Sequence, residues 1–132
     1  MLDVLSKGET VGERIAYYRK KKKLSQQQLA DLANISTCTI KRIENNKIDS
    51  SINTYNKIIE VLQVNTQLIY DSYLQFINSD YSNLIKSLRH QRRLTQKQFS
   101  KLLHVHIKTI MRWEQREQIP SREHYMLIKK LY

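Results

Sequence analysis

The chain is poor in the residues that make tight turns and cross-links. Its 132 residues include two glycines, one proline and one cysteine. So few glycines and prolines argue against sandwiches and barrels, which need many tight turns, and against glycine-rich phosphate loops. A lone cysteine, Cys38, cannot form a disulfide within the chain, so a reducing cytoplasm is the expected location. The many Leu, Ile, Lys, Gln and Arg residues instead predict an all-α protein.

Long apolar runs and acidic residues are also scarce. No run approaches 18 apolar residues, so no membrane-spanning segment is expected. The N-terminal stretch MLDVLSKGET has no basic region followed by an apolar one, so we expect no signal peptide. Against 23 Lys and Arg residues stand 12 Asp and Glu, a formal net charge of +11. This excess predicts an anionic partner, either a nucleic acid or a membrane surface.

No pattern typical of an active site or a metal centre is present in the sequence. It has no Ser-His-Asp arrangement, no paired carboxylates in a recognisable motif and little room for a catalytic domain. His104 and His106 raise the question of a metal site, but no second group of ligands is near in sequence, and His90 and His124 lack a standard spacing. We therefore expect no enzyme activity, no catalytic residue, no metal and no cofactor.

The sequence contains an internal repeat with an offset of 70 residues. Residues 19–45 align with residues 89–115 without a gap, and most matches are apolar at helical spacing or polar at expected helix ends. Residues 12–63 carry ten basic and five acidic groups, and residues 82–132 carry twelve and three, so the positive charge lies on the repeats. One fold used twice is the simplest reading. The identical pairs are Arg19/Arg89, Leu24/Leu94, Gln26/Gln96, Gln28/Gln98, Leu32/Leu102, Thr39/Thr109, Ile40/Ile110, Arg42/Arg112 and Glu44/Glu114.

Each repeat carries signals for the ends of short helices. In the first repeat we expect helix one over about 12–22 and helix four over about 51–62. Ser25 and Gln28 form a capping box at the start of helix two, and residues 95–98 repeat it.

Helices two and three are expected to meet at a tight turn. Asn34 tolerates the left-handed conformation that such a turn needs, and Ser36 is a good N-cap for helix three. Two short helices joined by a three-residue turn form a helix-turn-helix. The residues expected to face the core are Leu29, Ala30, Leu32 and Ala33 in helix two, Ile40 and Ile43 in helix three, and Tyr55, Ile58, Ile59 and Leu62 in helix four.

The segment LSQQQLADLANISTCTIKRIENNK resembles the Cro/repressor-like (XRE) helix-turn-helix family. That family has a Ser/Thr-Gln opening, a Leu-Ala pair, a turn, a Ser-capped recognition helix and an Ile-Glu-Asn/Gly ending. The segment LTQKQFSKLLHVHIKTIMRWEQREQIPS is similar to it too, although His104 and Arg116 stand where the family often has glycine. The resemblance implies two tandem lambda-repressor-like helix-turn-helix domains, residues 1–64 and 81–132, joined by a helical linker or fifth helix over 65–80.

The resemblance also implies that helix three enters the major groove of DNA with its N-terminus first. The outward residues of the two helices share an arginine and otherwise differ, so the two repeats are expected to read different sequences. Ile107 and Met111 fit thymine methyl groups but could equally complete the core. The expected base-reading residues are Thr37, Cys38, Lys41 and Arg42 in the first repeat and Ile107, Lys108, Met111 and Arg112 in the second.

Phosphate contacts are expected at the start of helix two, because free amides and the helix dipole favour an anion there. The basic end of helix one lies next to this point, although a merely solvated face is the alternative reading of its lysine run. Such contacts add affinity without sequence preference. The expected phosphate-binding residues are Lys22, Lys23, Gln26, Arg92, Arg93 and Gln96.

Other residues are expected to be structural. By the resemblance, Arg19 pairs with Glu44, and Arg89 pairs with Glu114. Trp113 is expected to fill the core position that Ile43 takes in the first repeat. Cys38 is read as a small polar filler, with redox sensing as the alternative. The apolar residues of 65–78 either close the core of the first repeat or also join the repeats or form a dimer surface.

The expected function is a sequence-specific regulator of transcription that binds double-stranded DNA, by default a repressor. It would act in the cytoplasm at the nucleoid, with a homodimer or protein partner left open and no membrane involved. The alternative is an antitoxin or other interaction module in which one helix-turn-helix binds a protein. Nonspecific coating of nucleic acid is a third reading.

Overall fold

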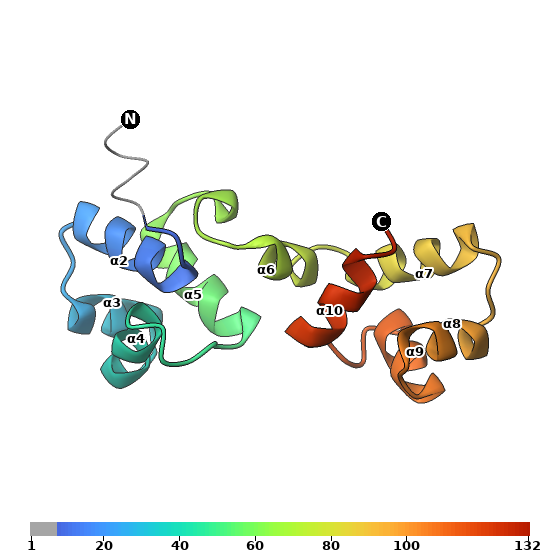
Figure 1. Cartoon of the computed structure of the whole chain (residues 1–132). Coiled ribbons are helices and arrows are strands. Elements are labelled where there is room, and N and C mark those ends of the chain that lie inside the picture. Colours follow the sequence, from blue (N-terminus) through green and yellow to red (C-terminus); the bar gives the residue numbers. More distant parts are fainter. Residues whose placement is uncertain (1–7) are drawn as a thin grey trace. The chain divides into compact units, whose positions relative to one another are not determined.

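The computed structural model describes residues 8–132, and every regular element in this part of the chain is a helix (Figure 1). The prediction of an all-α chain is thereby confirmed for these residues. The expected absence of a signal peptide concerns a stretch that lies mostly in residues 1–7, outside the described part. The chain divides into two compact units, Met1–Gln75 and Phe76–Tyr132, called unit 1 and unit 2 below. None of the helices of residues 8–132 is long and apolar enough to cross a membrane.

In the described part of unit 1, four helices have starts that are set by side-chain caps. Thr10, Ser25, Ser36 and Ser51 each accept a hydrogen bond from a backbone N–H in the first turn of the helix that follows. At Ser25 the capping box is complete, because Gln28 also accepts from the Ser25 N–H. The helices are α2 (Val11–Lys21), α3 (Gln26–Ala33), α4 (Thr37–Glu44) and α5 (Ile52–Leu62), followed by the short 3₁₀ helix η1 (Thr66–Leu68).

Unit 2 repeats these four helices at the same spacing. Each of its helices begins 70 residues after its counterpart, and the first three also end 70 residues later. The capping box at Thr95 and Gln98 is complete as well. The helices are α7 (Tyr81–Gln91), α8 (Gln96–Leu103), α9 (Ile107–Glu114) and α10 (Arg122–Lys129).

The turns between the helices are also repeated, although their residues differ. Asn34 and His104 end α3 and α8 in the left-handed conformation, each with φ of 57°. Asn46 and Arg116 follow α4 and α9 with φ of 58° and 60°. The absence of glycine at His104 and Arg116 therefore leaves the turn geometry intact, at the modest energetic cost of a side chain in this region.

The core of each unit lies between its helices, and one expected core residue is not in it. In α3, Leu29, Ala30 and Ala33 are buried as predicted, but Leu32 is 63% exposed. The prediction for Leu32 was wrong, because each helical residue advances by about 100° and Leu32 falls outside the arc that Leu29, Ala33 and Ala30 span. Its counterpart Leu102 is likewise exposed, at 47%. The inward residues of α4 and α5 are buried as predicted, and Trp113 is completely buried in unit 2.

The segment after α5, expected to be a helical linker or fifth helix, contains two short helical pieces. It consists of η1 and, after a break, α6 (Ser72–Ile77), and the boundary between the units falls inside α6. In unit 1, the buried ring of Tyr70 lies 6.2 Å from that of Tyr55, and burial raises the pKa of the Tyr70 phenol. In unit 2, the centre of the Phe76 ring lies 5.0 Å from the centre of the ring of Tyr125, the counterpart of Tyr55. Tyr55 and Tyr125 are equivalent residues, and each packs against an aromatic ring from a different part of the segment 65–80.

Candidate nucleic-acid interface

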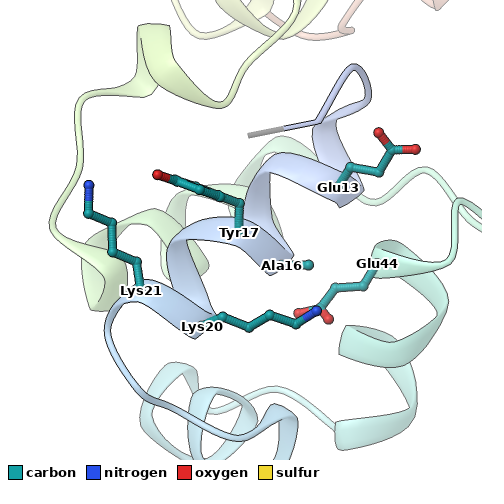
Figure 2. Close-up of a pocket in the computed structure, with 6 residues that line it drawn as sticks. All are labelled: Glu13, Ala16, Tyr17, Lys20, Lys21 and Glu44. Carbon is teal, nitrogen blue, oxygen red and sulfur yellow. The ribbon is translucent and has the colours of Figure 1, made fainter. Parts of the chain in front are cut away.

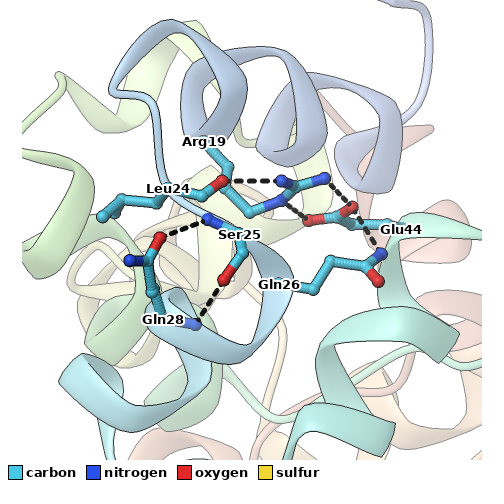
Figure 3. A network of polar contacts seen from close by, with 6 residues as sticks. All are labelled: Arg19, Leu24, Ser25, Gln26, Gln28 and Glu44. Carbon is cyan, nitrogen blue, oxygen red and sulfur yellow. Dashed lines mark hydrogen bonds and ion pairs between the residues drawn. The ribbon is translucent and has the colours of Figure 1, made fainter.

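An ion pair, buried in unit 1 and partly buried in unit 2, ties the first helix of each unit to the third. Arg19 Nε lies 2.7 Å from Glu44 Oε2, and Arg19 Nη2 donates to Glu44 Oε1 at 2.9 Å (Figure 3). A third donor, Arg19 Nη1, reaches the carbonyl of Leu24 in the turn before α3. The planar guanidinium therefore fixes α2, the turn and α4 in one arrangement.

Unit 2 contains the same pair between equivalent residues. Arg89 Nε lies 2.7 Å from Glu114 Oε2, and Arg89 Nη1 donates to the carbonyl of Leu94 at 3.0 Å. The hydrogen bond to Glu114 raises the pKa of the Arg89 guanidinium above its usual value. The structure thus brings together both pairs that the resemblance implied.

The glutamine at the start of the second helix joins this network. Gln26 Nε2 donates to Glu44 Oε1 at 3.0 Å (Figure 3). In unit 2, Gln96 Nε2 donates to Glu114 Oε1 at 3.3 Å. Both glutamines are the first residue of their helix, where a backbone N–H has no acceptor within the helix. The side chain is therefore held by the glutamate at the positive end of the helix dipole, a position where an anion would be stabilised.

The two basic residues that follow the first helix have different surroundings, and the difference is the same in both units. Lys22 Nζ donates to Gln63 Oε1 at 2.9 Å, and Arg92 Nη2 donates to the carbonyl of Leu131 at 2.6 Å. These two groups reach toward the end of α5 and of α10, respectively. Lys23 and Arg93, both exposed, occupy left-handed turn positions.

Lys20 is not among the phosphate-binding residues expected from the sequence, and the structure places it beside the ion-pair network. An open groove of about 550 Å³ runs along α2 (Figure 2). In the same groove, Lys21 Nζ lies 5.7 Å from the centre of the Tyr17 ring. The signal available in the sequence was the adjacency of Lys20 to Arg19. The groove is lined by Glu13, Ala16, Tyr17, Lys20, Lys21 and Glu44.

The third helix of each unit presents the predicted base-reading residues on its outer face. In α4 the inward positions are Ile40 and Ile43, and in α9 they are Ile110 and Trp113, all at most 2% exposed. Met111 is 37% exposed and so does not complete the core. The outward residues are exposed at Cys38, Lys41, Arg42, Lys108, Met111 and Arg112, and half-buried at Thr37 and Ile107.

A histidine begins the third helix of unit 2. His106 Nδ1 accepts a hydrogen bond from the Lys108 N–H at 3.1 Å, in the place where Ser36 caps α4. Within residues 8–132 no three His, Cys, Asp or Glu side chains lie close enough to hold a metal ion. His104 is the C-cap of α8, and His106 is the N-cap of α9.

The contact between the first and third helices is made by different residues in the two units. In unit 1, a Cβ on Gly12 would lie 2.0 Å from the carbonyl oxygen of Ile43, so only glycine fits. In unit 2, Ser82 takes the place of Gly12, and its hydroxyl donates to the carbonyl of Trp113 at 2.7 Å. The backbones approach closely in unit 1, and a hydrogen bond fills the wider gap in unit 2.

A second contact between equivalent positions also differs in chemistry between the two units. Thr10 Oγ1 donates to Asn46 Oδ1 at 2.8 Å in unit 1. The equivalent residues of unit 2, Asp80 and Arg116, form an exposed ion pair at 3.2 Å. Hydrogen bonds from Asn83, and then the nearby Arg116, hold the pKa of Asp80 below its usual range. Both pairs link the N-cap of the first helix to the second residue after the third helix.

Comparison with known proteins matches part of the chain. A family model described as helix-turn-helix matches residues 15–69, which run from within α2 to just after η1. No curated protein and no solved structure matches the chain. Residues 15–69 are therefore similar to helix-turn-helix domains, a similarity that suggests a DNA-binding regulator.

Proposed function

We propose that the protein is a sequence-specific regulator of transcription that binds double-stranded DNA with two recognition helices, α4 and α9, in two tandem helix-turn-helix domains. The observation that carries the proposal is the repeated site. In each unit an exposed outer helix face stands beside the same Arg–Glu pair and its bridging glutamine. Insertion into a major groove requires a helix whose outer face is exposed and whose inner face is held firmly by the rest of the domain.

The charge of the chain supports DNA as the partner. The formal net charge is +11, and residues 64–81 contain no Lys or Arg, so the charge is concentrated on the repeated regions. Such a distribution attracts the phosphate backbone and makes affinity fall as salt rises. The proposed phosphate contacts are Lys22, Lys23, Gln26, Arg92, Arg93 and Gln96, together with Lys20.

The outer residues of α4 and α9 are proposed to read the bases. Arg42 and Arg112, at equivalent positions, can each bond the two major-groove acceptors of guanine. The remaining readers are Thr37, Cys38 and Lys41 in α4 and Ile107, Lys108 and Met111 in α9. Because these sets differ, the expected binding site for one chain is not palindromic.

Repression is the proposed outcome, since a protein bound over a promoter blocks polymerase. The protein would then act at the nucleoid in the cytoplasm. A homodimer would instead bring four recognition helices to a longer, two-fold symmetric site.

The alternative function assigns unit 2 to a protein partner, as in an antitoxin. Two observations favour it: the helix-turn-helix match ends at residue 69, and the outer face of α9 is more apolar than that of α4. Under this alternative Arg112→Ala would leave DNA affinity unchanged.

The test is selection of bound duplexes from a random pool by the full chain, followed by footprinting. The proposal expects one enriched site with two separate protected segments. Failure to enrich any sequence would contradict specific binding and favour nonspecific coating.

A further inference from the structure

We propose that α9 recognises a thymine by its C5 methyl group and that Met111 makes the contact. This inference rests on the proposed function and names the base for which unit 2 is specific. It concerns the residue of the outer face that differs most in chemistry from its counterpart in unit 1, where Lys41 occupies the position.

The position of Met111 leaves its side chain available to a partner. The inward positions of α9 are filled by Ile110 and Trp113, both 0% exposed, whereas Met111 is 37% exposed. Ile107 lies four residues earlier, one turn along the same face, and is half-buried. The two side chains form an apolar strip on the outer face of α9, and the flexible thioether of methionine adapts to a small apolar group.

The surroundings of this strip decide what can cover it. Lys108 and Arg112, each directly after one of the apolar residues, are exposed. Residues 82–132 carry twelve basic and three acidic groups, a net charge of +9. The occupant must therefore be anionic as a whole and apolar at one point. In the major groove of DNA the thymine methyl is the apolar group that the base edges offer, and phosphates surround it.

The equivalent face of unit 1 provides a matched comparison. There the strip is replaced by Thr37 and Lys41, and an exposed lysine can donate to the acceptors of guanine. Exchange of the two residues should therefore exchange the preferred base. Since Met111 and Lys41 are both exposed, neither Met111→Lys nor Lys41→Met removes a core contact.

The test uses the full chain and the duplex that selection yields. Bases within reach of α9 are first identified as those of the protected segment that contains the base whose preference is relaxed in Arg112→Ala. Each thymine among them is then replaced by deoxyuridine, which lacks only the methyl group. For the wild-type protein we expect one such replacement to weaken binding about three- to fourfold, the effect of about 0.8 kcal/mol for one buried methyl group.

The variants show whether Met111 is responsible. Met111→Lys should bind the thymine and deoxyuridine duplexes equally and should prefer guanine at that position. Met111→Leu keeps an apolar side chain and should keep the sensitivity to the methyl group. Lys41→Met, the matched control in unit 1, should leave the deoxyuridine effect in the α9 segment unchanged.

Two results would overturn the proposal while leaving DNA binding in place. Deoxyuridine could be tolerated at every thymine, or Met111→Lys could keep the sequence preference and affinity of the wild type. The latter would mean that the strip on α9 faces a protein instead. Absence of any selected duplex would be a failure of the proposed function itself, so the two failures are distinguishable.

Discussion

Gly12 and Ser82 occupy equivalent positions, but the first has no room for a side chain and the second has a side chain that makes a hydrogen bond. Gly12 touches the backbone of α4 so closely that a Cβ would lie 2.0 Å from the Ile43 carbonyl oxygen, whereas Ser82 fills the same place in unit 2. A repeat that aligns without gaps therefore still differs in how near its helices come. This difference cannot be read from the sequence, because a glycine inside a helix has several explanations.

Gly12→Ala is expected to destabilise unit 1. Alanine favours a helix over glycine by about 1 kcal/mol, but the added methyl group must push α2 and α4 apart, at a cost of about 1–3 kcal/mol beyond that gain. Urea unfolding followed by circular dichroism measures the free energy of unfolding. Ser82→Ala is the control in unit 2 and should lose only one hydrogen bond, about 1 kcal/mol. A Gly12→Ala variant as stable as the wild type would contradict the close approach.

Arg19→Ala is expected to cost more than any change on the outer helix faces. The carboxylate of Glu44 would stay buried without its countercharge, which typically lowers the free energy of unfolding by about 3–5 kcal/mol. Arg19→Lys should recover only part of the loss, because an ammonium cannot make the paired contacts. If Arg19→Ala weakened DNA binding without any change in the unfolding curve, Arg19 would be a DNA contact rather than a structural residue.

Helix ends are the elements that sequence reasoning predicted best. The first helix was expected over about 12–22 and runs over Val11–Lys21, and Ser25, Ser36 and Ser51 cap the helices that follow. Caps are local chemistry, so a short stretch of sequence contains the information. The break between η1 and α6 and the exposure of Leu32 depend on which neighbours pack against them, and no local pattern encodes that.

The site was predictable to a similar degree. The two Arg–Glu pairs followed from the resemblance, and the outward faces of α4 and α9 followed from helical spacing. The hydrogen bonds of Lys22 to Gln63 and of Arg92 to Leu131 span 41 and 39 residues, so they depend on the tertiary fold. The same holds for the groove that places Lys20 near Glu44.

Removal of either capping box should destabilise its unit by a similar amount. In Ser25→Ala the Gln28 N–H loses its acceptor, and in Thr95→Ala the Gln98 N–H loses its acceptor, each at a cost of about 1 kcal/mol. Gln27→Ala, an exposed change outside the box, serves as the control and should have little effect. Unchanged unfolding curves for both cap variants would show that the second helices are held by their packing alone.

For the whole molecule, the charge predicts a strong dependence of binding on salt. Each phosphate contact adds about 0.9 to the slope of log affinity against log salt concentration. Lys20→Ala should lower this slope by about one unit at equal cost for all sequences. Lys22→Ala should lower it less, since the Lys22 ammonium is engaged by Gln63. Equal and small effects of both changes would mean that the end of α2 does not face the backbone.

The two repeated units together carry the central claim that one chain reads DNA with both α4 and α9. The most direct measurement is the affinity of Arg42→Ala and Arg112→Ala for the selected duplex and for its single-base variants. The account predicts that each change costs about 1–3 kcal/mol and relaxes the preference at one base, with the two bases in different segments of the site. An Arg112→Ala variant with the affinity and base preferences of the wild type would contradict it, since α9 would then not read DNA.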